Sequence, residues 1–83
     1  MEYEIGFRPQ AIRDFRGLSP EVAQRISDKI TLLSHDLTGD VKRLKHFEPK
    51  YRLRVGDWRV LFEISGNSLQ IWRVRHRRDV YDG

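Results

Sequence analysis

Five arginines in the C-terminal half of the chain have a spacing that can place them on one surface. Arg52 and Arg54 alternate with apolar residues in the stretch YRLRV, as on one strand of a β-sheet. Arg59 follows a Gly-Asp turn, and Arg73 and Arg75 alternate in the same way within IWRVR. Side chains two residues apart in a strand point to the same face. These arginines are therefore candidates for a single cationic face.

The chemistry that such a face favours is the binding of phosphate. A guanidinium group stays charged and donates paired hydrogen bonds to phosphate oxygens. Several arginines around one phosphate also stabilise the extra negative charge of a pentacoordinate transition state. Without an anion the same charges repel one another and destabilise the sheet. The alternative is that the arginines only keep the exposed face of a sheet soluble and protect its edges.

Other side chains near the arginines can move protons or contact RNA. His76 follows Arg75, and because imidazole titrates near neutral pH it is a candidate acid or base, with a surface or partly packed histidine as the alternative. His46 and Glu48 are weaker candidates at the edge of the site. The other basic residues of this half, together with Arg73, predict an electrostatic footprint for an anionic partner such as a nucleic acid, with a solvated surface as the alternative; they are Lys42, Arg43, Lys45, Lys50, Arg73, Arg77 and Arg78.

Composition indicates one small domain with an anionic partner. The chain has 83 residues and no cysteine, so neither disulfides nor thiolate zinc sites stabilise it. Residues 1–40 contain five Lys/Arg and seven Asp/Glu, whereas residues 41–83 contain eleven and five, a net charge of 11 − 5 = +6. The positive charge of this half favours a nucleic acid or an acidic protein as the partner. A membrane surface is the least favoured partner.

Targeting signals and metal ligands are not recognisable in the sequence. The start MEYEIGFRPQ lacks the basic and apolar segments of a signal peptide, and no apolar run is long enough to span a bilayer. Three scattered histidines do not have the spacing of a metal site. We therefore expect a cytoplasmic protein without a cofactor or metal.

The elements that must position the arginines follow from periodicity and turn signals. A first strand is expected in EYEIGF, a short helix over residues 9–16, and a longer helix from Pro20, capped by Ser19, to about Leu37. The basic segment VKRLKHFEPK is expected to be an irregular loop, with a fragment of strand or helix as an alternative. Three strands are expected over residues 50–55, 58–64 and 69–75. The order β-α-α-β-β-β predicts an α+β fold, with a helical hairpin packed on one antiparallel-rich four-stranded sheet.

Turn lengths set the expected register of this sheet. A two-residue turn at Gly56-Asp57 pairs Arg54 with Arg59. A three-residue loop over residues 66–68 pairs Arg59 with Arg75 and places Trp72 opposite Phe62. This register puts the arginines on the solvent-facing side and both tryptophans, Trp58 and Trp72, under the helices.

Two stretches resemble a known family. YRLRVGDWRVLFEI and IWRVRHRRDVY are similar to the RelE/ParE superfamily of toxins from bacterial and archaeal toxin–antitoxin pairs, and the likeness covers nearly the whole chain. The closing HRRDVY resembles the RelE branch more than the ParE branch. The resemblance implies a single RelE-like toxin domain over residues 1–83.

The resemblance also implies an activity, which is metal-independent cleavage of mRNA in the A site of the ribosome. The 2′-hydroxyl attacks the adjacent phosphate and leaves a 2′,3′-cyclic phosphate and a 5′-hydroxyl. Arg59 and Arg75 then stabilise the phosphorane, while Arg52 and Arg54 hold the mRNA backbone. The family often has lysines at this last pair, so fixed charge replaces proton transfer there. Tyr81 matches the family's C-terminal aromatic residue, which stacks on a base or activates the 2′-hydroxyl; the alternative is a packing anchor.

Partners and alternatives follow from the same likeness. The family implies a cognate antitoxin that covers the toxin with an acidic or amphipathic segment. A ParE-like toxin would instead bind and poison DNA gyrase without nuclease activity. A third possibility is an inactive relative that only binds an antitoxin or nucleic acid.

Overall fold

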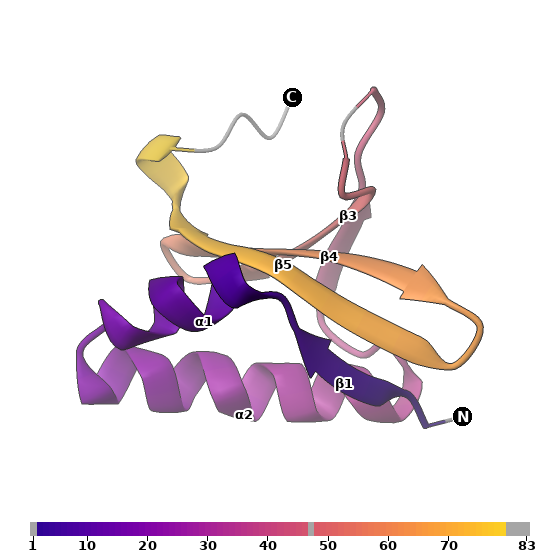
Figure 1. The fold of residues 1–83 in the computed structure, drawn as a ribbon, viewed down its shortest axis with the longest axis horizontal. Coiled ribbons are helices and arrows are strands. Elements are labelled where there is room, and N and C mark those ends of the chain that lie inside the picture. The colour runs from indigo at the N-terminus through magenta and orange to yellow at the C-terminus, as the bar shows by residue number, and fades with distance from the viewer. Residues whose placement is uncertain (1, 47, 80–83) are drawn as a thin grey trace.

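Two helices lie against one face of a five-stranded sheet in the computed structural model, which describes residues 2–46 and 48–79 (Figure 1). In chain order the elements are β1 (Glu4–Phe7), α1 (Pro9–Arg16), α2 (Pro20–Asp36), β2 (Asp40–Arg43), β3 (Tyr51–Val55), β4 (Trp58–Ser65), β5 (Ser68–His76) and the 3-10 helix η1 (Arg77–Asp79). The strand order is β1-β5-β4-β3-β2, in which β1 is parallel to β5 and the other neighbours are antiparallel. The predicted α+β fold is confirmed, with one strand more than expected.

Local signals in the sequence fix both helices. Pro9 begins α1 at a position where its missing N–H costs nothing. The Ser19 side chain accepts a hydrogen bond of 3.3 Å from the N–H of Val22 and so caps α2. Leu37 ends α2 in the left-handed conformation, at φ 60°. The predicted helices therefore form at the expected places.

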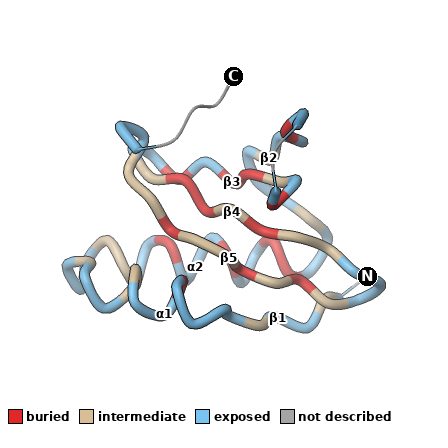
Figure 2. Tube along the Cα trace, turned by 45° about the horizontal axis from the view of Figure 1, so that its top comes forward, coloured by how far each residue is buried: buried red, intermediate tan, exposed pale blue. Residues whose placement is uncertain are grey.

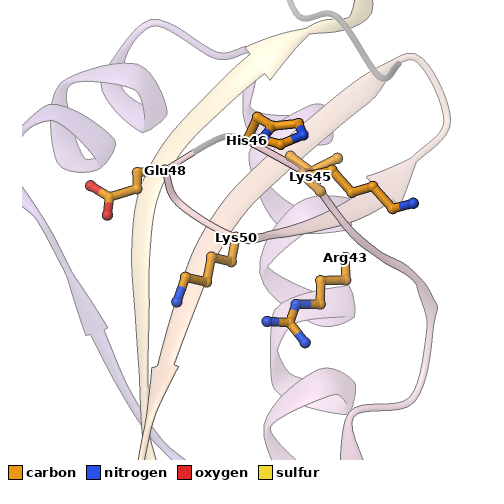
Figure 3. A pocket seen from close by; sticks show the side chains of 6 residues that line it. Arg43, Lys45, His46, Glu48 and Lys50 are labelled. Carbon is orange, nitrogen blue, oxygen red and sulfur yellow. The ribbon is translucent and has the colours of Figure 1, made fainter.

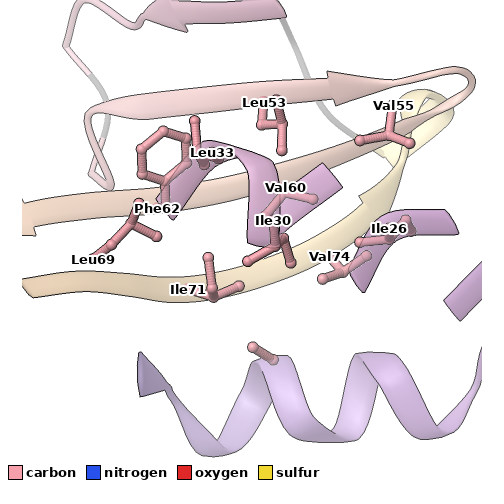
Figure 4. Close-up of a cluster of buried hydrophobic side chains, with 11 residues drawn as sticks. Ile26, Ile30, Leu33, Leu53, Val55, Val60, Phe62, Leu69, Ile71 and Val74 are labelled. Atoms are coloured by element: carbon pink, nitrogen blue, oxygen red, sulfur yellow. The ribbon is translucent and has the colours of Figure 1, made fainter. Parts of the chain in front are cut away.

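The core lies between α2 and the three central strands. Ile26, Ile30 and Leu33 recur at helical spacing along one side of α2 and are almost fully buried. They pack against the inner side chains of the sheet, which are Leu53, Val55, Val60, Phe62, Leu69, Ile71 and Val74 (Figure 4). Figure 2 shows that buried positions gather in α2, β3, β4 and β5, whereas β1 and α1 are mostly exposed. None of the described helices is long and apolar enough to cross a membrane.

The additional strand, β2, lies in the basic segment expected to be irregular. It pairs antiparallel with β3, so that Lys42 lies opposite Arg52 and Asp40 lies opposite Arg54. Its sequence, DVKR, contains one apolar residue and therefore carries too little alternation to be recognised as a strand. The strand adds a cation, Lys42, beside Arg52 and a carboxylate, Asp40, beside Arg54.

A β-bulge between β4 and β5 corrects the expected register. The turn has two residues, Gly66 and Asn67, rather than three, because Ser65 pairs with Ser68. The pairing shifts by one between Leu61 and Phe62, which restores the predicted pair Arg59–Arg75 farther along the strands. A short turn and a bulge together thus replace the longer loop.

Trp72 occupies the bulge and does not lie under the helices. Ile71 and Val74 are both buried in the core, so the two residues between them lie on the other face. Trp72 and Arg73 are accordingly half-exposed. The prediction that Trp72 belongs to the core is wrong, whereas Trp58 does pack against the core.

Candidate functional site

The face of the sheet opposite α1 and α2, here called the open face, carries two cross-strand rows of mostly cationic side chains. All five arginines that the sequence indicated share this face, as the strand pairing requires. The first row contains Lys42, Arg52, Leu61 and Arg73, and the second contains Asp40, Arg54, Arg59 and Arg75.

Arg59 stands in the middle of the second row and is held firmly. Only 7% of its surface is exposed. Its guanidinium donates hydrogen bonds of 2.9 and 3.0 Å to the main-chain carbonyls of Gly56 and Trp58. These carbonyls orient the group, and they carry no formal negative charge. Arg59 is thus a pre-oriented cation between Arg54 and Arg75.

Asp40, which the sequence did not single out, balances part of the charge. Its carboxylate lies 3.6 Å from the Arg52 guanidinium and 4.0 Å from that of Arg54. Arg52 also donates a hydrogen bond of 3.3 Å to the main-chain carbonyl of Asp40. The Asp40 carboxylate, which is half-exposed, therefore lies near two arginines. Both distances are too long for a tight ion pair.

Asp14 of α1 engages Arg73 more closely. Its two oxygens accept hydrogen bonds of 2.9 and 3.2 Å from Arg73, and one of them also accepts the N–H of Val74 at 2.8 Å. Burial raises the pKa of Asp14, but these hydrogen bonds and the charges of Arg73 and Arg75 outweigh burial, so the pKa is lowered. The charge of Arg73 is thus neutralised by α1, a pairing across 59 residues that no sequence pattern signals.

Arg75 completes the second row. It forms no ion pair with a described residue, although its charge contributes to the lowered pKa of Asp14. It lies opposite Arg59 and is partly exposed. Arg59 and Arg75 are therefore cross-strand neighbours on the open face, an arrangement that suits one shared anion.

One proposed participant, His76, is not brought into this row. His76 pairs with Trp58 on the helix side of the sheet, where their rings meet edge to face at 5.2 Å. Its Nδ1 accepts a hydrogen bond from the N–H of Arg78. The geometry consequently separates His76 from the arginines. Tyr81 lies outside the described residues.

The remaining basic residues form two groups. The loop between β2 and β3 stands on the open side of the sheet (Figure 1) and surrounds a hollow of about 630 Å³ (Figure 3). This hollow is lined by Arg43, Leu44, Lys45, His46, Glu48 and Lys50. At η1, Arg77 lies 3.7 Å from Asp57, while Arg78 is exposed. Residues 2–46 and 48–79 contain no group of three His, Asp or Glu side chains that could hold a metal ion.

Comparison with known proteins gives this arrangement a context. The family model described as the ParE toxin of the type II toxin–antitoxin system parDE matches residues 5–81. A 48-residue segment is 40% identical to Toxin RelE3 of Methanocaldococcus jannaschii; it covers 58% of this chain and 54%, about half, of that toxin.

Solved structures show the same fold. The chain is similar to one in the RelB–RelE antitoxin–toxin complex of Methanococcus jannaschii, with a TM-score of 0.75, 29% identity, and coverage of 92% of this chain and 94% of that one. For the toxin–antitoxin complex RelBE2 of Mycobacterium tuberculosis, the TM-score is 0.80 with 27% identity, and coverage is 93% and 100%. With the family model spanning nearly the whole chain, the protein is a toxin of a type II toxin–antitoxin pair. Within that class it belongs to the RelE/ParE superfamily, as its sequence motifs indicated.

Proposed function

We propose that the protein is a ribosome-dependent, metal-independent endoribonuclease that cleaves mRNA in the A site and so inhibits translation in the cytoplasm. The observation that carries the proposal is the row of Arg54, Arg59 and Arg75 across three neighbouring strands of the open face. Such a row matches the negative charge of an RNA backbone.

The proposed reaction needs an electrostatic site more than a reactive side chain. The 2′-hydroxyl loses its proton and its oxygen bonds to the adjacent phosphorus, and the bond to the 5′-oxygen breaks. The leaving oxygen takes up a proton, which gives a 2′,3′-cyclic phosphate and a 5′-hydroxyl. Negative charge grows on the phosphorane during this step, and pre-oriented arginines stabilise it without reorganisation. Arg59 and Arg75 supply that stabilisation, while Arg52 and Arg54 hold the mRNA backbone.

Proton transfer is left to groups outside the arginine row. In this proposal Tyr81 stacks on a base or activates the 2′-hydroxyl. His76 would have to reach the RNA from the end of β5, because it lies on the helix side of the sheet. Because His76 packs against Trp58 on the opposite face, we expect a smaller loss from His76→Ala than from Arg59→Ala.

The basic loop and η1 are proposed to contact ribosomal RNA. The exposed cations that surround the hollow in Figure 3 lie on the same side of the sheet as the arginine rows. Lys42 belongs to the first row, and Arg77 and Arg78 lie at the far end of β5. Arg73 takes no direct part in this proposal while Asp14 neutralises it.

The experiment that tests the nuclease proposal uses ribosomes that carry a defined A-site codon. The purified toxin is expected to cut within that codon, and mapping of mRNA ends is expected to show 5′-hydroxyl products. Arg59→Ala should abolish the cuts. Lys29→Ala, which removes one charge from the exposed face of α2, is the matched control and should cut normally. Full cleavage by Arg59→Ala would refute the role of the row.

A second candidate function is the poisoning of DNA gyrase. It is favoured by the ParE description of the matching family model, although the named relatives are RelE proteins. A gyrase supercoiling assay run beside the ribosome assay separates the two. Inhibition of gyrase without any mRNA cuts would replace the nuclease proposal.

We also propose a cognate antitoxin with an acidic or amphipathic segment. Two similar structures are toxin–antitoxin complexes by name. An acidic segment across the open face would relieve repulsion between its arginines.

A further inference from the structure

We infer that Arg8 and Trp72 form a stacking platform for one nucleobase of the RNA, which we call the stacking pair. The inference rests on the proposed binding of RNA to the open face. It adds a base-contacting site beside the arginine rows, which contact phosphates.

The two-residue turn and the bulge together place Trp72 and Arg73 on the open face. The Ser65–Ser68 turn pairs Ile71 with Phe62, so Trp72 follows on the open face, and the shift at Leu61 keeps Arg73 on that face as well. Trp72 is partly exposed and next to Arg73 of the first row. Because the Trp72 ring lies on the open face, it is not part of the hydrophobic core.

Arg8 lies over this ring. Its guanidinium carbon is 4.0 Å from the centroid of the Trp72 ring, a cation–π contact. The main chain of Arg8 is fixed, because its N–H donates a hydrogen bond of 2.9 Å to the carbonyl of Ile71, and Pro9 begins α1 directly afterwards. Arg8 is nevertheless an exposed residue. The outer side of the guanidinium plane is therefore available to a ligand.

A nucleobase is the ligand that fits a stacked arginine and indole. Unstacked bases of single-stranded RNA stack on aromatic rings and on guanidinium planes. Trp72 lies beside the Leu61–Arg73 pair, and Arg75 lies opposite Arg59, which is two residues from Leu61 along β4, about 7 Å along a strand. A short RNA segment can thus place one phosphate beside Arg59 and Arg75 and a nearby base on the stacking pair.

The test compares RNA with and without bases. Trp58→Phe leaves Trp72 as the single tryptophan of the chain, since the sequence contains two. We expect its fluorescence to be quenched by a single-stranded RNA oligonucleotide and much less by the same oligonucleotide with abasic positions. Circular dichroism of each variant checks that the fold is intact.

Substitution of Trp72 supplies the second measurement. Trp72→Leu should weaken binding of the normal oligonucleotide about five- to 100-fold and leave binding of the abasic one unchanged. Trp72→Phe keeps a ring and should retain most of the affinity. Equal affinities of wild type and Trp72→Leu for normal RNA, or equal reductions with both oligonucleotides, would overturn the stacking pair.

Failure of this inference is distinguishable from failure of the nuclease proposal. Base-dependent binding by a protein that cuts no mRNA on ribosomes supports the stacking pair and refutes the nuclease. Normal ribosomal cleavage by Trp72→Leu, together with base-independent binding, refutes the stacking pair and leaves the nuclease standing.

Discussion

Arg59 and Arg75 face each other across β4 and β5, but their charges are held in different ways. Main-chain carbonyls fix Arg59, whereas Arg75 extends from the outer part of the row with no described carboxylate paired to it. A phosphate between them would be held by one rigid group and one adjustable group. This difference leads to a prediction for Arg75.

Arg75→Ala is expected to reduce the rate of ribosomal cleavage about 100- to 1000-fold, because it removes one donor to the developing charge. Arg75→Lys keeps the charge but not the paired hydrogen bonds, and it should fall between wild type and Arg75→Ala. Single-turnover cleavage on programmed ribosomes measures both rates. Equal rates for the lysine and alanine variants would show that charge at this position contributes nothing.

Asp14→Asn is expected to lower the free energy of unfolding by about 1–3 kcal/mol at neutral pH, since it removes a charged hydrogen-bonded pair with Arg73. The folded pKa of Asp14 is lowered, so the carboxylate contributes stability above its unfolded pKa, near 3.8. That contribution disappears as the pH falls through the lower, folded pKa. The gap between wild type and variant should therefore close in acid.

Urea unfolding of both proteins at about pH 7 and about pH 2.5 measures this gap. Asn can still accept the N–H of Val74, which makes the comparison one of charge more than of shape. A gap of the same size at both pH values would contradict an ionic contribution from Asp14.

At the scale of elements, the sequence predicts the segments that carry strong local signals. Pro9 and the Ser19-Pro20 cap mark the helices, and their predicted starts are confirmed. The Gly56-Asp57 turn fixes the pair Arg54–Arg59 in the same way, since Gly56 takes φ +58° there. The shared face of the arginines is consequently predictable from alternation and one turn.

What the sequence does not predict depends on interactions between distant residues. β2 has little pattern of its own and forms because β3 offers it a partner. No residue near the bulge signals it in the sequence, so alternation alone places Trp72 on the wrong face. Asp14 and Arg73 meet only because α1 covers the edge of β5 beyond the last residue of β1. Tertiary packing decides each of these features.

The loop between β2 and β3 is expected to act through charge alone. Lys45→Ala combined with Lys50→Ala should weaken binding to ribosomes and reduce the slope of log affinity against log salt by up to about two, because each lysine neutralises at most one phosphate. The chemical rate on bound mRNA should be unchanged. Affinity measurements over a range of salt concentrations test this, with Lys29→Ala as control. An unchanged slope would place ribosomal RNA elsewhere.

For the whole molecule, the positive charge of the C-terminal half predicts how the antitoxin binds. The net charge of the chain is +4, and most of its cations lie on or beside the open face. We expect the affinity of the toxin–antitoxin complex to fall steeply as salt is raised, mainly through slower association. Stopped-flow association at several ionic strengths measures the effect. An affinity that is flat with salt would indicate an interface driven by apolar packing.

The parallel pairing of β1 with β5 has a consequence for biosynthesis. Glu4 pairs with Ser68, so β1 cannot pair with β5 until more than sixty further residues have been translated. Such long-range closure is slow and cannot occur on a partial chain. Arg75 follows within that same last strand. A nascent chain therefore has no complete cationic row until β5 has been translated.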